Sequence, residues 1–195
     1  MNLVYIHGAG ATTESFNYIR QNLHNYNEIL IEYDSRLGFD NNLEAMKITL
    51  KNCSNLFFIC HSLGGVYALH LADYFKKSVL GALTISTPYG GSKSAVYAKY
   101  FLPFNQLLKD ITPNSKPIKI SNSIKILHPW CNIVTTRGDC PWILEPNDGV
   151  VTIASMQNRK DMEFLHLHHN HYEVVISPKT VDIIQQKINE IIHRS

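Results

Sequence analysis

The sequence predicts an α/β fold with a mainly parallel sheet that carries helices on both faces. Short apolar runs alternate with longer amphipathic stretches, as in repeated strand–helix–strand units. The run at residues 55–60 is continuously apolar, which is typical of a strand buried on both faces of a parallel sheet. With 195 residues, the chain has room for one domain with a sizeable core.

The hydrophobic periodicity predicts the individual elements. Strands are predicted at residues 3–7, 28–33, 55–60, 79–86, 124–128 and 162–168. Helices are predicted at residues 14–23, from 43 to 50 and beyond, 63–75 and 180–192. The glycine- and proline-containing stretch 88–123 interrupts the alternation, with a helix-like piece at 97–108. We expect this stretch to form a small cap or lid-like insertion in a single domain of residues 1–195.

The composition argues against several classes of protein. Apolar residues make up 45% and charged residues 17%, as in ordinary globular domains. The net charge is only +2 and no basic stripe is visible, so no nucleic-acid partner is expected. No apolar run approaches the ~18 residues of a membrane span, and the first residues lack the features of a signal peptide. We therefore expect a cytoplasmic protein without stable membrane insertion; the sequence indicates no oligomeric state.

The four cysteines have neither a C-x-x-C pair nor zinc-ribbon spacing. We expect free thiols, and a Cys131–Cys140 bridge is the alternative for an exported protein.

A run from Phe57 to Gly65 (FFICHSLGG) carries the most information about chemistry. It leads from an apolar strand through a sharp turn into a helix, and a serine at such a turn presents its hydroxyl above the carboxyl edge of the sheet. Gly64 and Gly65 provide the small residues that the turn requires. Ser62 is therefore the candidate nucleophile, and the N–H of Leu63 is placed to stabilise an oxyanion. The alternative is a serine that caps a buried helix.

This run resembles the G-x-S-x-G nucleophile elbow of the α/β-hydrolase superfamily, with Cys60 in place of the first glycine. The His7-Gly8 pair after the first strand is similar to the oxyanion loop of the same proteins. The resemblance assigns the second oxyanion donor to the N–H of Ala9. A dinucleotide site is the alternative for this glycine-containing turn, but the third small residue of that fingerprint is missing.

In this fold the acid follows the serine, and the histidine follows the acid. The run Asn-Asp-Gly-Val-Val at residues 147–151 resembles the acid loop of bacterial triacylglycerol lipases, which implies that Asp148 is the catalytic acid. Asp139 is the alternative acid, and a purely structural turn is the alternative reading of Asp148.

Four histidines crowd the region where the base is expected. The Asn170-His171 pair, between the last strand and the last helix, resembles the base loop of the same lipases. The resemblance implies that His171 is the base, with His169 as the second candidate. His166 and His168 share one face of a strand and are expected to be structural. A zinc site in this run is the weaker alternative. The run resembles the H-x-H-x-D-H motif of metallo-β-lactamase-like hydrolases, but Asn170 stands at the aspartate position and little chain follows to supply the remaining ligands.

The resemblance spans nearly the whole chain and also includes residues 86–92 and 108–115. It implies a minimal member of the superfamily that lacks the first strands of the fuller fold. It further implies a lipase- or esterase-like serine hydrolase that cleaves a small-molecule or lipid-like acyl ester through an acyl-enzyme, with no cofactor and no metal. A thioesterase, an amidase and a non-catalytic binding protein are the alternatives. Aromatic residues of the insertion are candidates for the wall of an acyl site: Tyr89, Tyr97, Phe101 and Phe104.

Overall fold

Six parallel strands form one sheet in the order β2-β1-β3-β4-β5-β6. The computed structural model describes residues 1–93, 95, 109–138, 140 and 143–193. The strands are β1 (Asn2–Ile6), β2 (Asn27–Ile31), β3 (Leu56–His61), β4 (Val79–Ile85), β5 (Trp130–Thr135) and β6 (Glu163–Leu167). Five of the six predicted strands are confirmed to within two residues at each end.

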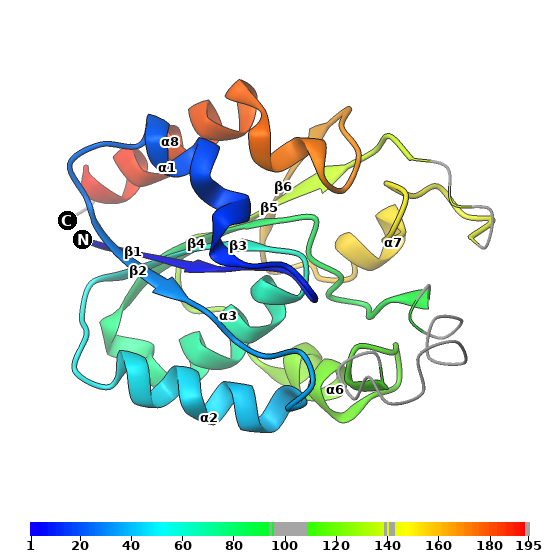
Figure 1. Ribbon diagram of the computed structural model, residues 1–195, viewed down its shortest axis with the longest axis horizontal. Helices are drawn as coiled ribbons and strands as arrows, with labels where there is room; N and C mark the ends of the chain where they lie inside the picture. Colours follow the sequence, from blue (N-terminus) through cyan, green and yellow to red (C-terminus); the bar gives the residue numbers. More distant parts are fainter. Residues whose placement is uncertain (94, 96–108, 139, 141–142, 194–195) are drawn as a thin grey trace.

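Helices cover both faces of this sheet, as predicted. The α-helices are α1 (Asn17–Asn22), α2 (Phe39–Leu50), α3 (Leu63–Phe75), α6 (Lys116–Ser123), α7 (Ile153–Met156) and α8 (Pro178–Ile192). Short 3-10 helices are η1 (Thr13–Phe16), η2 (Lys76–Ser78) and η3 (Glu173–Ile176). In Figure 1, α1 and α8 lie above the sheet, and α2, α3 and α6 lie below it. This three-layer arrangement follows from parallel strands joined by crossover helices.

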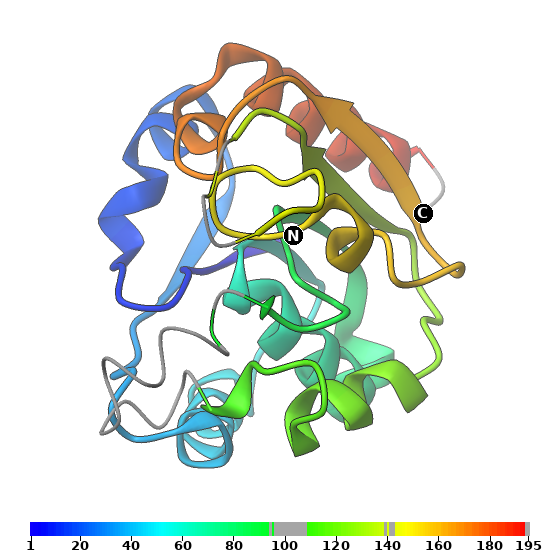
Figure 2. The same cartoon turned by 90° about the vertical axis from the view of Figure 1, so that its right-hand side faces the viewer.

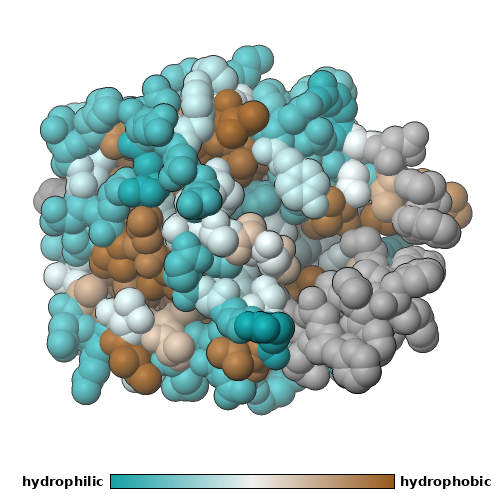
Figure 3. All heavy atoms as spheres, viewed as in Figure 1, coloured by the Kyte–Doolittle hydropathy of each residue, from teal (hydrophilic) through white to brown (hydrophobic). Residues whose placement is uncertain are grey.

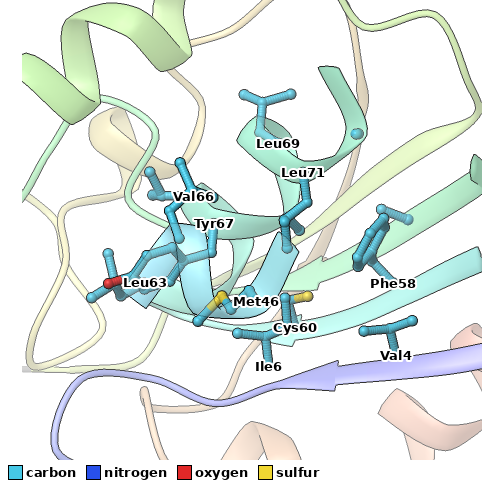
Figure 4. Close-up of a cluster of buried hydrophobic side chains, with 14 of the residues drawn as sticks. Val4, Ile6, Met46, Phe58, Cys60, Leu63, Val66, Tyr67, Leu69 and Leu71 are labelled. Atoms are coloured by element: carbon cyan, nitrogen blue, oxygen red, sulfur yellow. The ribbon is translucent and has the colours of Figure 1, made fainter. Parts of the chain in front are cut away.

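Strand β1 shows how the core is divided by the sheet. Val4 and Ile6 contribute to a hydrophobic cluster with α2 and α3, whereas Leu3 and Tyr5 contribute to a second cluster with α1 and α8. All four side chains are fully buried. Figure 4 shows the first cluster, in which residues of β1 and β3 lie beneath α3. Because both faces of a strand are covered, the strands read as continuous apolar runs.

The fifth strand lies later in the chain than the sequence predicted. Residues 124–128 form no strand, and β5 begins at Trp130. Ile124 and Ile126 are only partly buried and pack against the first cluster from its edge. The prediction was wrong because this alternating segment resembles a half-buried strand, whereas the true strand pairs on both sides and is buried along its whole length.

The predicted insertion at 88–123 is described only in part. Its helix-like piece at 97–108 lies outside the described residues. Its last part forms α6, which packs on α3: His70 of α3 hydrogen-bonds the carbonyl oxygen of Pro117 (3.1 Å) and the hydroxyl of Ser121 (3.0 Å).

The loops that follow the strands gather at one end of the sheet. Figure 2 turns this end to the viewer, with the loops after β4, β5 and β6 in front. The face shown in Figure 3 is largely hydrophilic, and its hydrophobic residues form separate patches. In the described part of the chain, no helix has the length and hydrophobicity needed to cross a membrane.

Arg159, in the segment before β6, forms hydrogen bonds with the end of α6. Its side chain is almost completely buried and donates to the carbonyl oxygens of Ser121 (2.5 Å) and Ile124 (2.6 Å). It also pairs with the carboxylate of Asp161 at 2.7 Å. Removal of the guanidinium therefore takes a donor away from two carbonyl oxygens and a carboxylate.

We predict that Arg159→Met lowers the free energy of unfolding by about 3 kcal/mol, because buried acceptors lose their donors. Urea denaturation measures the change. Arg36→Met is the matched control: Arg36 also pairs with an aspartate, Asp34, but its side chain is 85% exposed. The control is expected to leave stability nearly unchanged, because an exposed ion pair is screened by solvent; equal effects of the two substitutions would contradict the prediction.

Candidate active site

Ser62 sits in a sharp turn between β3 and α3. Its backbone has φ 52° and ψ −124°, a conformation that non-glycine residues rarely adopt. Two hydrogen bonds hold it: the Ser62 N–H donates to the carbonyl oxygen of Ile85 (2.8 Å), and the Thr87 hydroxyl donates to the Ser62 carbonyl oxygen (2.9 Å). The side chain is partly exposed and lines a cavity. Ser62 thus lies in a strained turn at the border of that cavity.

Three glycines allow the turn to pack tightly. A Cβ at Gly64 would lie 2.0 Å from the carbonyl oxygen of Ile6, and a Cβ at Gly65 would lie 2.1 Å from Oγ1 of Thr87. A Cβ at Gly8 would lie 3.1 Å from Cβ of Ser62. The loop after β1 therefore lies directly against the turn, and no side chain fits between them.

Asp148 and His171 form a buried hydrogen-bonded pair. The distance from Nδ1 of His171 to Oδ2 of Asp148 is 2.7 Å, and neither side chain is more than 4% exposed. The Thr135 hydroxyl donates to the same Oδ2 (2.5 Å), and the N–H groups of Val150 (3.0 Å) and Val151 (2.8 Å) donate to Oδ1. The carboxylate is therefore fully hydrogen-bonded in its ionised form.

These contacts keep Asp148 ionised despite its burial. Burial by itself would raise the pKa of Asp148, but the hydrogen bond from His171 and the charge of that ring outweigh it, with further help from Thr135 and Val151. The pKa of Asp148 is lowered as a result. An ionised carboxylate beside Nδ1 favours the tautomer of His171 whose Nε2 has no proton.

The loop that carries His171 is held at several points. The N–H of His171 donates to the carbonyl oxygen of Asp148 (3.0 Å), and Oδ1 of Asn170 accepts from the N–H groups of Tyr172 (2.9 Å) and Glu173 (2.8 Å). An ion pair joins Glu173 to Arg137 in the loop after β5. Because Nδ1 of His171 faces Asp148, Nε2 is the nitrogen available to the cavity.

The other candidate histidines lie elsewhere. His166 and His168 are exposed, and their rings contact Gln157 and Thr136. The backbone of His169 bonds to Leu167 and Arg137, and its ring does not line the cavity. Among the described residues the structure thus pairs the acid candidate Asp148 with His171. The alternative acid Asp139 lies outside the described residues.

A cavity of about 580 Å³ lies over Ser62 at the carboxyl end of the sheet. Ser62 and His171 both line it, and its surface is predominantly apolar. Its apolar lining includes Leu63, Ile111, Val150, Val151, Val175 and Ile176. Polar residues from the first helical segment line another part, namely Glu14, Ser15, Asn17 and Tyr18. A smaller cavity of about 350 Å³ lies at the amino ends of β5 and β6 and includes none of the candidate residues.

The two candidate oxyanion donors border the same cavity. Ala9 and Leu63 both line it. Leu63 is the first residue of α3, so its N–H has no acceptor within the helix. Within the described part of the chain, no hydrogen bond joins Ser62 to His171; such bonds are often long in the absence of substrate.

Tyr89 does not line this cavity. Its ring is fully buried beside α3, and its hydroxyl accepts a hydrogen bond from Nε1 of Trp130 (2.8 Å) and bonds the Thr84 hydroxyl (3.0 Å). These buried partners satisfy the hydroxyl in the core, away from the acyl site for which the sequence proposed it. The other three aromatic candidates lie outside the described residues: Tyr97, Phe101 and Phe104.

Three polar residues of the site were missed at the sequence level. Thr135 contacts Asp148, and the Ser86 hydroxyl bonds Thr135 in turn (2.8 Å). The signal of Thr135 was hidden, because the strand that ends at this residue was predicted too early in the chain. The third residue is His61, which directly precedes Ser62, and its position next to the nucleophile is a signal that could have been used.

His61 is a buried histidine beside His171. Its Nε2 lies 2.9 Å from the backbone carbonyl oxygen of His171, and the two ring centroids are 4.8 Å apart. Burial, followed by the charge of His171, lowers the pKa of His61 from 6.5 to about 3. The ring is therefore neutral in the folded protein at all ordinary pH values.

This shift makes folding stability depend on pH. Between pH 6.5 and about 3 the unfolded chain binds a proton at His61 and the folded chain does not. The free energy of unfolding is therefore highest above this range and falls on acidification, by at most about 1.4 kcal/mol per pH unit from His61 alone.

We predict that His61→Gln removes the part of this pH dependence of stability that comes from His61. Urea denaturation of both proteins at several pH values from neutral to acid tests it, since all other titrating groups are shared; parallel pH dependences would contradict it.

All four cysteines are free, with Cys60 and Cys131 buried. Among the described residues, no group of three or more His, Cys, Asp or Glu side chains is placed to hold a metal ion.

Solved lipases and esterases resemble the fold as a whole. A metagenomic carboxyl esterase superposes with a TM-score of 0.78 at 14% identity, over 97% of this chain and 76% of that chain. A carboxylesterase structure from Nitrososphaera gargenis gives a TM-score of 0.74 at 14% identity, over 100% of this chain and 92% of the other. Phospholipase PlaB from Legionella pneumophila also gives 0.74 at 14% identity, over 95% of this chain, which spans 58% of PlaB.

No protein-family model matches the sequence, and the curated proteins give no match to it either. At 14% identity the structural likeness concerns the fold. The parallel six-stranded sheet, its covering helices and these superpositions lead to one conclusion: the chain has the α/β-hydrolase fold found in lipases and esterases.

Proposed function

We propose that this protein is a serine hydrolase that cleaves carboxylic esters with Ser62 as nucleophile, His171 as base and Asp148 as acid. One observation carries the proposal: the imidazole that is hydrogen-bonded to a buried, ionised carboxylate lines the same cavity as a serine held in a strained turn. A carboxylate that orients a histidine beside an exposed nucleophile is the arrangement that acyl transfer requires.

The proposed reaction begins when Nε2 of His171 takes the hydroxyl proton of Ser62 and the serine oxygen attacks the ester carbonyl. The carbonyl oxygen becomes an oxyanion that accepts hydrogen bonds from the N–H groups of Ala9 and Leu63. Loss of one such donor typically costs about 2.7–4 kcal/mol of transition-state stabilisation. The positive end of the α3 dipole adds to this stabilisation.

The tetrahedral intermediate then collapses, and His171 returns its proton to the departing alcohol. The acyl group remains bound to Ser62 as an ester. A water molecule gives its proton to His171 and attacks the acyl-enzyme, which releases the carboxylic acid and restores the serine. Asp148 stays ionised throughout and stabilises the imidazolium.

The cavity supports an ester with an apolar acyl group as substrate. Valine and isoleucine side chains from the loops after β5 and β6 line it beside Ser62. Its volume of about 580 Å³ is typical of small-molecule sites. The structural neighbours named above include two carboxylesterases and a phospholipase, which agrees with ester hydrolysis in general.

We predict that Ser62→Ala and His171→Ala each lower the rate of p-nitrophenyl butyrate hydrolysis by several orders of magnitude, because each removes a group that acts in the transition state. His169→Ala is the matched control and is expected to retain near-normal rates. A steady-state assay with all four proteins measures the effect. A fluorophosphonate probe should label the wild-type protein and leave Ser62→Ala unlabelled.

A wild-type protein that neither hydrolyses esters nor reacts with the probe would overturn the proposal in favour of a non-catalytic role. Loss of activity in His169→Ala with retention in His171→Ala would reassign the base.

We also predict that kcat/KM rises with acyl-chain length from acetate to a medium-length chain and then levels off or falls. Each methylene buried against the apolar lining adds about 0.8 kcal/mol of binding, or roughly fourfold, until the cavity is filled. Val175 lines the cavity and is almost completely buried. Val175→Phe should therefore move the optimum to shorter chains. A series of p-nitrophenyl esters tests both proteins, and a flat series in the wild-type protein would place the acyl group elsewhere.

A further inference from the structure

We infer that His61 is a positioning residue: its ring Nε2–H holds the backbone carbonyl of His171 and thereby fixes the base over Ser62. The inference rests on the proposed serine hydrolase function. Its basis is a single contact of 2.9 Å between two residues that are 110 positions apart in the chain.

The chemistry of the contact fixes the tautomer of His61. A backbone carbonyl oxygen only accepts hydrogen bonds, so the proton must lie on Nε2 of His61. The neutral ring then carries no proton on Nδ1. This nitrogen faces the loop after β1, where a Cβ at Gly8 would lie 3.3 Å from it. His61 therefore contacts the oxyanion loop on one side and the base loop on the other.

The remaining anchors of His171 come from a different part of the chain. Its ring Nδ1 and its backbone N–H both bind Asp148. These two bonds set the distance from the base to the acid but not the distance from the base to Ser62. His61 is the neighbour of Ser62 in the chain and the last residue of β3. Its bond to the His171 carbonyl thus links the base directly to the strand that carries the nucleophile.

The surroundings of His61 keep this link intact during catalysis. The side chain is buried, and its ring lies against the ring of His171. Three titratable groups act on it: the charges of His171 and His7 disfavour its protonation, and Asp148 favours it. The Nε2–H donor is present in the neutral ring and would also be present in a protonated one, so it persists when His171 gains and loses its proton. A misplacement of about 1 Å between reacting groups can cost about 100-fold in rate.

Two substitutions of His61 test the inference, because they distinguish the effect of its hydrogen-bond donor from the effect of its buried ring. His61→Phe keeps a buried ring and removes the donor, whereas His61→Gln keeps an N–H donor that can reach the carbonyl. We expect kcat to fall about 10- to 100-fold in His61→Phe with KM changed less than about threefold. In His61→Gln most of the loss in kcat should be recovered.

The matched control is His70→Phe. His70 is also a buried histidine whose Nε2 bonds a backbone carbonyl, that of Pro117, but it lies between α3 and α6 and does not line the cavity. This variant is expected to lower Tm and to leave kcat unchanged. If His61→Phe does not fold, His61→Leu takes its place as the donor-free variant.

Wild-type kcat in His61→Phe, or an equal loss in His61→Phe and His61→Gln, would overturn the inference. The ¹⁵N chemical shifts of His61 in the wild-type protein provide a second measurement that does not depend on activity. They should report a neutral ring with its proton on Nε2, and a proton on Nδ1 would also overturn it. A wild-type protein that has this tautomer and no esterase activity would refute the proposed function and leave the hydrogen bond in place.

Discussion

The close packing of the start of α3 against the end of β1 is the constraint on which the rest of the site depends. At Gly64 there is no room for even one carbon atom between the helix and the carbonyl oxygen of Ile6. This contact brings the loop after β1 against the turn at Ser62, and one residue of each segment, Ala9 and Leu63, lines the cavity. The turn can be held in a strained backbone conformation because two hydrogen bonds to the end of β4, at Ile85 and Thr87, over-determine it.

The burial of the Asp148 carboxylate places a second, electrostatic constraint on the site. An ion with so little contact with water is tolerated only if hydrogen bonds replace its hydration. Two backbone amides, one hydroxyl and one imidazole supply them. The same bonds that compensate for burial also orient the ring of His171, so the stability of the loop and the orientation of the proposed base have a common origin.

Much of the fold and of the candidate site could be predicted, because buried parallel strands and the turn around Ser62 leave patterns in adjacent residues. The hydrogen-bonded pair of Asp148 and His171 could be proposed from loop resemblance alone. The start of β5 could not, since Pro129 separates the alternating segment from the true strand and Asn132 interrupts its apolar run. Tyr89 shows a second limit: composition does not reveal whether a ring faces a cavity or a buried indole such as that of Trp130.

The short helix α1 has a consequence for the size of the cavity. Tyr18 of this helix lines the cavity, while Ile19 faces inward into the cluster that contains Ile184 and Ile188 of α8. One wall of the cavity is thus supported from behind by α8, which contributes no residue to the cavity lining. Substitutions on the inner face of α8 would therefore change the size of the cavity and leave Ser62, Asp148 and His171 as they are.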